Sequence, residues 1–106
     1  MQNKLASYLG LAKKAGAVIC GTDLIIDGMR RGKVMLVVAA SDISAGTRKK
    51  LSDKCSFYDK PLLDSGLDMD ALSKAVGLDR LTAAAGVTDA GFVKMITGAA
   101  GDGNKQ

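Results

Sequence analysis

The side chains that could carry chemistry in this chain are mostly aspartates. The 106 residues contain no histidine, so the commonest general base and metal ligand is absent, and all eleven acidic residues are aspartates. Asp64, Asp68 and Asp70 cluster, but their spacing misses the longer ligand ladder and distal glutamate of a calcium loop. Helix capping accounts for Asp68, and the helix dipole accounts for Asp70. We therefore expect no catalytic residue, no metal site and no cofactor.

The two cysteines, Cys20 and Cys55, are far apart in the sequence and form no CxxC pair. The simpler interpretation of Cys20 and Cys55 is that they are two reduced, buried thiols in a cytoplasmic protein. The alternative is that they form a disulfide or bind a metal ion together. Cys20 precedes an expected helix start, where a thiolate is favoured, but without a histidine partner we interpret it as a buried strand residue.

Residues 21–42 indicate binding rather than catalysis. Gly21, Thr22 and Asp23 form a glycine turn followed by two residues able to cap a helix. The helix would end near Arg31, and an apolar run over residues 34–40 would form a buried strand. The unsatisfied N–H groups at such a helix start can receive electronegative atoms of a ligand.

The net charge of +4 is unevenly distributed. Residues 1–54 carry ten Lys/Arg and four Asp, a net charge of +6, whereas residues 55–106 carry five and seven, a net charge of −2. A basic half favours a polyanionic partner. No apolar run reaches the roughly 20 residues of a membrane helix, and the N-terminus lacks the apolar region of a signal peptide. We expect a cytoplasmic protein with no membrane partner.

Periodicity and turn signals predict strands alternating with helices. Expected helices span residues 3–15, 22–31, 44–55, 68–77 and 88–99, and expected strands lie within 17–20, 34–40, 57–63 and 82–87. Ser44, Asp68 and either Thr88 or Asp89 are the expected helix caps, and Gly77 is an expected helix end. This pattern predicts one domain over residues 1–100, a three-layer α/β/α sandwich, with a Gly-rich disordered tail over residues 101–106.

Several segments, taken in order, resemble the ribosomal proteins of the L7Ae type, small α/β/α proteins that bind kink-turn RNA. They are a glycine-led second helix at Gly21, an Arg-Gly helix end at Arg31, an apolar strand and Asp42 after it. The bacterial YlxQ-like branch is the most similar, on the Leu-Gly-Leu-Ala opening at residues 9–12 and the segments at residues 47–55 and 87–92. The resemblance runs from about residue 5 to residue 97 and implies a mixed sheet of about four strands.

The resemblance also implies where RNA would bind. The start of the second helix would enter a widened groove beside sheared G·A pairs, while basic side chains would hold phosphates. The loop after the fourth helix would pack apolar side chains on a flipped-out base. The residues assigned to RNA binding are Lys13, Lys14, Gly21, Thr22, Asp23, Arg30, Arg31, Lys33, Ser41, Asp42, Leu78 and Arg80.

This chain departs from the family pattern at the second helix. Leu24 replaces a glutamate and Asp27 replaces a lysine, so one acceptor and one phosphate partner are lost. Leu78 and Leu81 either wedge against a base or are buried in the core. We expect a non-enzymatic, ribosome-associated protein with structured RNA, such as ribosomal RNA, and ribonucleoprotein proteins as partners. The alternative is a protein-interaction adaptor with a degraded RNA face.

Overall fold

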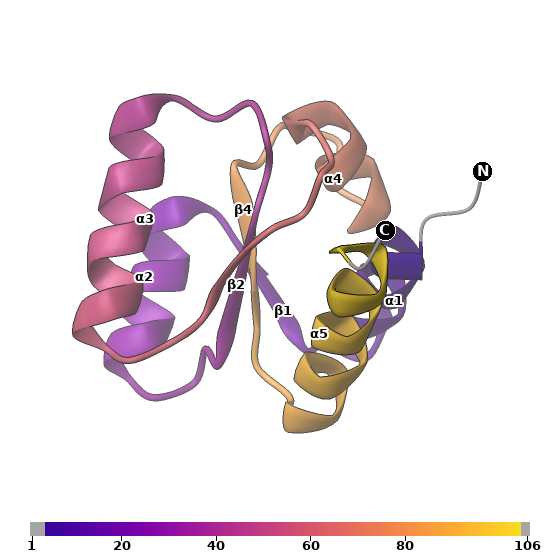
Figure 1. Ribbon diagram of the computed structural model, residues 1–106, viewed down its shortest axis with the longest axis horizontal. Coiled ribbons are helices and arrows are strands. Elements are labelled where there is room, and N and C mark those ends of the chain that lie inside the picture. The colour runs from indigo at the N-terminus through magenta and orange to yellow at the C-terminus, as the bar shows by residue number, and fades with distance from the viewer. Residues whose placement is uncertain (1–3, 105–106) are drawn as a thin grey trace.

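Helices and strands alternate along the chain in the computed structural model, which describes residues 4–104. In chain order the elements are α1 (Lys4–Lys14), β1 (Val18–Cys20), α2 (Thr22–Arg30), β2 (Leu36–Ala39), α3 (Ala45–Phe57), β3 (Leu62–Asp64), α4 (Met69–Ala75), β4 (Ala84–Val87) and α5 (Ala90–Asn104). Helices cover both faces of one sheet, so the predicted α/β/α class is confirmed (Figure 1).

The sheet is mixed, as predicted, with strand order β1-β4-β2-β3. β4 runs antiparallel to both β1 and β2, whereas β2 and β3 are parallel. Every residue of β2 and β4 is buried, which explains why the β2 sequence is apolar on both faces. The edge strands β1 and β3 contain only three residues each, a length typical of sheet edges that resist pairing with other chains.

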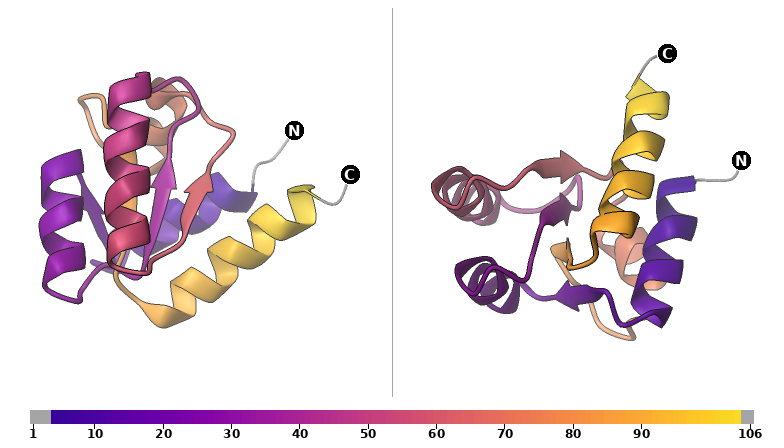
Figure 2. Two further views of the ribbon diagram at one scale, coloured as in Figure 1. Left: turned by 60° about the vertical axis from the view of Figure 1, so that its left-hand side comes forward. Right: turned by 90° about the horizontal axis from the view of Figure 1, so that it is seen from below.

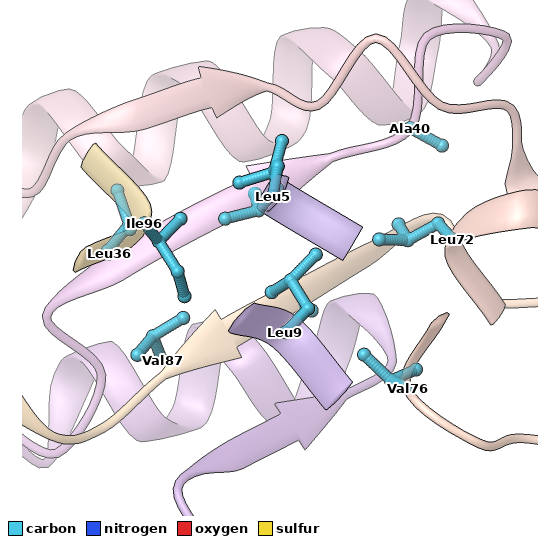
Figure 3. Packing of buried hydrophobic residues seen from close by; sticks show 10 residues of the cluster. Leu5, Leu9, Leu36, Ala40, Leu72, Val76, Val87 and Ile96 are labelled. Carbon is cyan, nitrogen blue, oxygen red and sulfur yellow. The ribbon is translucent and has the colours of Figure 1, made fainter. Parts of the chain in front are cut away.

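Alternate side chains of β2 enter two separate cores. Leu36 and Val38 face α1, α4 and α5, where Leu9 and Ile96 are completely buried (Figure 3). The other face of the sheet packs against α2 and α3 in a smaller core. The three layers are distinct when the molecule is seen from below (Figure 2). Among the described residues, no helix is long and apolar enough to span a membrane.

Glycine allows α2 to approach the sheet closely. A Cβ atom added to Gly28 would lie 2.6 Å from Cγ2 of Val34, and one added to Gly86 would lie 3.1 Å from Cγ1 of the same side chain. These glycines therefore fix how deeply α2 sits over β4, and with it the position of both ends of the helix.

Most predicted helix ends are confirmed. The side chains of Ser44 and Asp68 accept hydrogen bonds from the N–H groups three residues later, at 3.1 and 2.7 Å. Asp89 accepts from Gly91 N–H at 2.8 Å, which settles the choice between Thr88 and Asp89 for the start of α5. Gly77 follows α4 with φ +70°, as expected of a helix end.

Several boundaries differ from the predictions, three of them for a clear physical reason. α3, which was expected to end at Cys55, continues to Phe57, because Tyr58 N–H extends the helical ladder to Lys54 O at 3.0 Å, and the strand expected within residues 57–63 is β3 at Leu62–Asp64. β4 begins at Ala84 and not at Thr82, since Thr82 N–H donates to the Ser73 hydroxyl at 2.8 Å instead of a neighbouring strand. α5 continues through residues 101–104 of the expected tail, whereas residues 3, 105 and 106 lie outside the described residues.

Candidate nucleic-acid interface

The start of α2 is open. Gly21 is the residue before the helix, with φ +98°, and as a glycine it has no side chain that could accept a hydrogen bond from the first N–H groups of α2. The expectation that Thr22 or Asp23 caps this helix is therefore wrong: both already lie within its first turn. Because the first backbone N–H groups of a helix have no partner inside it, they are available here to an incoming acceptor.

A buried hydroxyl connects this helix start to the loop between α4 and β4. The Gly21 N–H donates to Thr82 Oγ1 at 3.3 Å, and the same hydroxyl donates to Ala84 O at 2.8 Å. Thr82 N–H in turn donates to Ser73 Oγ, whose hydroxyl donates to Met69 O in α4. The two loops that the resemblance assigns to RNA are thus parts of one hydrogen-bonded unit.

An acidic, a basic and an apolar side chain lie exposed around the open helix start. The Asp23 side chain is 89% exposed, and its Oδ1 lies 3.0 Å from Nζ of Lys50, which comes from α3. Leu24, one residue later, is 59% exposed. Lys50 therefore supplies a cation beside the helix start, where Asp27 has replaced the lysine of the family pattern on α2 itself.

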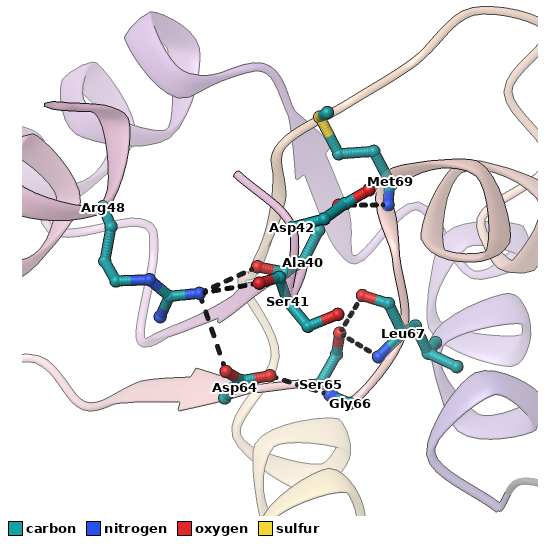
Figure 4. A network of polar contacts seen from close by, with 9 residues as sticks. All are labelled: Ala40, Ser41, Asp42, Arg48, Asp64, Ser65, Gly66, Leu67 and Met69. Carbon is teal, nitrogen blue, oxygen red and sulfur yellow. Dashed lines mark hydrogen bonds and ion pairs between the residues drawn. The ribbon is translucent and has the colours of Figure 1, made fainter. Parts of the chain in front are cut away.

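The loop after β2 lies at the same edge of the sheet, and its groups are largely occupied (Figure 4). Asp42 accepts a hydrogen bond from Met69 N–H at 2.8 Å at the start of α4. Arg48 donates to Ala40 O at 3.2 Å and to Ser41 O at 3.5 Å, and lies 3.6 Å from Asp64. Arg48 holds this loop in place, and Asp42 has a structural partner whether or not RNA is present.

The loop between α4 and β4 borders a small open cavity. Its volume is about 250 Å³, and it is lined by Asp70, Ser73, Lys74, Leu78, Asp79, Arg80 and Leu81. The two leucines, which were expected to behave alike, differ. Leu78 is partly buried against the larger core, whereas Leu81 is 61% exposed. Leu81 is therefore the exposed leucine of this loop, with Arg80 next to it in the sequence.

The arginines at the end of α2 lie away from the open start. A nine-residue helix separates them from Gly21 by about 13 Å. Both pair with Asp27, at 2.6 Å from Arg30 and 3.0 Å from Arg31. The Arg30 hydrogen bond, together with the Arg31 charge, holds the pKa of the Asp27 carboxyl below its ordinary value. Lys33 follows in the same turn and is exposed.

Lys13 and Arg80 both act on the Cys20 thiol at the end of β1. Burial raises the pKa of this thiol, and the two positive charges oppose that shift. Lys13 and Lys14 are both exposed residues in the last turn of α1. Burial also raises the pKa of Cys55, and both cysteines are free thiols, as the simpler interpretation predicted.

The acidic side chains between β3 and the end of α4 make structural contacts. No group of three or more cysteines or aspartates among them is placed to hold a metal ion. Every buried side-chain nitrogen or oxygen in this part of the chain has a hydrogen-bond partner. Asp64 accepts a hydrogen bond from Gly66 N–H in the loop after β3. Asp70 forms an ion pair with Lys74, and Asp68 caps α4.

Sequence reasoning missed three residues of this interface. Thr82, Lys50 and Arg48 each act across a tertiary contact, over 61, 27 and 8 positions of sequence respectively. No local pattern marks such partners. The exposed character of Leu81 was left open, because a leucine beside a glycine turn suits a core and a surface equally.

Comparisons with known proteins place this geometry in context. Residues 3–97 match the model of the ribosomal protein L7Ae/L30e/S12e/Gadd45 family. RNA-binding protein YlxQ of Enterococcus faecium is 33% identical over 93 residues, which cover 88% of this chain and 87% of that protein. RNA-binding protein YlxQ of Bacillus subtilis (strain 168) is 35% identical over 88 residues, covering 83% and 86%.

Two solved structures share the fold. A protein of unknown function from Bacillus halodurans C has a TM-score of 0.88 at 33% identity, covering 94% of this chain and 99% of that one. A 15.5kD RNA binding protein of Giardia lamblia has a TM-score of 0.75, covering 93% and 83%. Its identity is 18%, so this second likeness concerns the fold alone.

Proposed function

We propose, from the premise that the chain belongs to the ribosomal protein L7Ae/L30e/S12e/Gadd45 family, that it is a non-enzymatic RNA-binding protein of the cytoplasm. Its RNA is bent, of the kink-turn kind, and belongs to the ribosome or another RNA–protein complex. The observation that carries this proposal is the open start of α2, which the Thr82 hydroxyl joins to the loop after α4.

Each part of this surface has a task in the proposal. The first N–H groups of α2 receive acceptor atoms of the RNA, and the exposed Asp23 carboxylate accepts from guanine amino groups. Leu81 packs on an unstacked base at the rim of the small cavity. Lys50, Lys13 and Arg80 neutralise nearby phosphates.

The departures from the family pattern shape this proposal. Asp23 accepts a hydrogen bond but, unlike an asparagine, cannot donate one. Leu24 offers no acceptor, and Asp27 is already engaged by two arginines. The specificity therefore depends on fewer direct contacts, and Lys50 of α3 replaces the cation missing from α2.

The experiment compares a kink-turn RNA with a fully paired duplex of equal length. We expect about tenfold tighter binding of the bent RNA, on the order of one good bidentate contact. Asp23→Ala should reduce this ratio. Asp53→Ala is the matched control, because Asp53 is also exposed and also pairs with a lysine at 3.0 Å, but on the outer side of α3. A ratio near one for the unaltered protein contradicts the kink-turn proposal.

A second candidate function is favoured by exposed apolar side chains on the same surface. Leu24 and Leu81 are 59% and 61% exposed, which suits a protein partner as well as a base. In that case the chain is an adaptor on an RNA-binding fold. Crosslinking in cells, followed by identification of the attached molecules, separates the two. Enriched RNA supports the first function, and protein partners without enriched RNA support the adaptor.

A further inference from the structure

The carboxyl ends of α2 and α3 lie side by side at the edge of the sheet opposite the open helix start (Figures 1 and 2). Just before these ends, Met29 Sδ and Cys55 Sγ are 3.9 Å apart in the smaller core. This contact, together with the Asp23–Lys50 ion pair near the other end of α2, shows that α2 and α3 pack side by side in the same direction, so the residues that follow Met29 and Cys55 lie at adjacent helix ends.

Both ends have the same backbone turn. A residue with positive φ follows each helix, Gly32 at +75° after α2 and Asp59 at +56° after α3. The next residue is a lysine in each case, and its N–H donates back to the helix at 2.8 Å, from Lys33 to Gly28 O and from Lys60 to Cys55 O. The two turns therefore present two lysines in equivalent positions.

A basic–aromatic patch results at these two helix ends. We define it as Arg30, Arg31, Lys33, Lys54, Phe57 and Lys60. The arginine side chains are 60% and 57% exposed. Two acids, Asp27 and Asp59, partly offset the five cations. Cations near helix carboxyl ends also stabilise the helices themselves, but that effect has no need of the aromatic ring.

Phe57 is the most exposed large apolar side chain of the described residues, at 77%. Its ring packs against Tyr58 in an edge-to-face arrangement, with centroids 4.9 Å apart and planes at 88°. Tyr58 in turn packs against the smaller core, so it anchors the exposed ring. Much of the Phe57 ring remains open to solvent, beside positive charge.

We propose that the basic–aromatic patch binds unpaired nucleotides of an RNA. A base stacks on Phe57 while the surrounding cations contact the phosphates on either side, the combination that single-stranded nucleic acids require. A protein partner fits less well, because the centre of a protein interface is depleted of lysine, whereas three lysines and two arginines lie at the same two helix ends as this ring.

This inference extends the proposed function and rests on it in one respect, that the partner is RNA. It does not depend on a preference for bent RNA, since the patch and the open start of α2 lie at opposite ends of the same helix. The patch would hold a strand that leaves the folded part of the RNA.

The test uses the full chain and a uridine octamer as the single-stranded probe. Phe57→Ala should weaken binding of the octamer at least about fivefold, as expected for the loss of one base–aromatic stack. Phe57→Trp should retain the affinity, because it keeps an aromatic face. Leu24→Ala is the control, since Leu24 is an exposed apolar side chain at the other end of α2.

Amide chemical shifts measured with the octamer locate the contact. Changes at residues 30–33 and 54–60 support the proposal, whereas changes confined to residues 21–24 and 78–82 overturn it. Equal affinities of the unaltered protein and Phe57→Ala also overturn it, as does an octamer that does not bind. If the octamer experiments fail but the protein still prefers the kink-turn RNA, the inference about the patch is wrong and the proposed function stands. Octamer binding without kink-turn preference removes only the proposed specificity.

Discussion

The two ends of α2 differ in nearly every physical respect. The start has an uncapped backbone, a buried hydroxyl that ties it to a neighbouring loop, and one exposed carboxylate next to a lysine. The end has a closed hydrogen-bonded turn and a concentration of positive charge beside an exposed ring. One end can read the shape and edges of a ligand through directed groups. Under the proposed function, the other attracts phosphate groups through its positive charge.

This difference teaches how one short helix can serve two modes of binding. Directed hydrogen bonds give specificity that salt weakens little, whereas phosphate neutralisation gives affinity that falls steeply with salt. Substitutions at the start of α2 should therefore change the preference for bent RNA, whereas substitutions at its end should change the salt dependence of binding.

The largest expected effect comes from breaking the connection at the start of α2. Thr82→Val removes the partner of Gly21 N–H and of Ala84 O, and we expect a loss of about 2 kcal/mol in the free energy of unfolding. Urea denaturation measures it. Thr82→Ser keeps the hydroxyl and should lose clearly less. Equal losses for the two variants would show that the methyl group, and not the hydroxyl, matters here.

The next effect concerns the other end of the helix. Arg30→Ala combined with Arg31→Ala should lower the slope of log affinity against log salt by up to about two, one for each lost phosphate contact. The preference for bent over straight RNA should not change. Titrations at three salt concentrations test this, with Lys4→Ala plus Lys94→Ala as a control of equal charge on the α1 and α5 side. A lost preference would contradict the separation of the two ends.

A smaller effect is expected at the turn after α3. Asp59 has φ +56°, a conformation that glycine adopts without strain, so Asp59→Gly should stabilise the fold by about 0.5 kcal/mol. Asp53→Gly, inside α3, should instead destabilise by about 1 kcal/mol. Denaturation midpoints distinguish these opposite signs. The first change also removes an acid beside the basic–aromatic patch and should tighten octamer binding.

The smallest expected effect is the pH dependence of the Asp27 ion pairs. Since Arg30 lowers the folded-state pKa of this carboxyl, the pairs stabilise the fold at neutral pH. This contribution is complete above the unfolded pKa of about 4 and disappears as the pH falls through the lowered folded value. The stability difference between the unaltered protein and Asp27→Asn should therefore vanish in acid, and high salt should reduce it at pH 7.

Features predicted correctly from the sequence act over one helical turn or along one strand. Ser44 and Asp68 bond to amides three residues away, and the apolar run within residues 34–40 needs only to be buried on both faces. The early helix end predicted at Cys55 has a different origin. α3 continues to Phe57 because Cys55 and Tyr58 both pack into the smaller core, a tertiary contact that the local sequence does not indicate.

The candidate interface could be predicted only in part. The sequence placed Gly21 and Asp23 at a helix start, but it could not reveal that this start is uncapped or that Lys50 approaches from another helix. The basic–aromatic patch could not be predicted either, because the ends of α2 and α3 come together only when the two helices pack in the same direction. These facts follow from tertiary packing, and no short-range pattern encodes them.

The Thr82 hydroxyl has a consequence for the rate at which a complex forms. Because it fixes the start of α2 to the loop after α4 before any ligand arrives, neither loop has to be ordered during binding. Association is then limited by diffusional encounter and orientation, not by a slow rearrangement. Under the proposed function, the Thr82→Val variant should encounter RNA by diffusion as often as the unaltered protein, but a smaller fraction of encounters should lead to the bound complex.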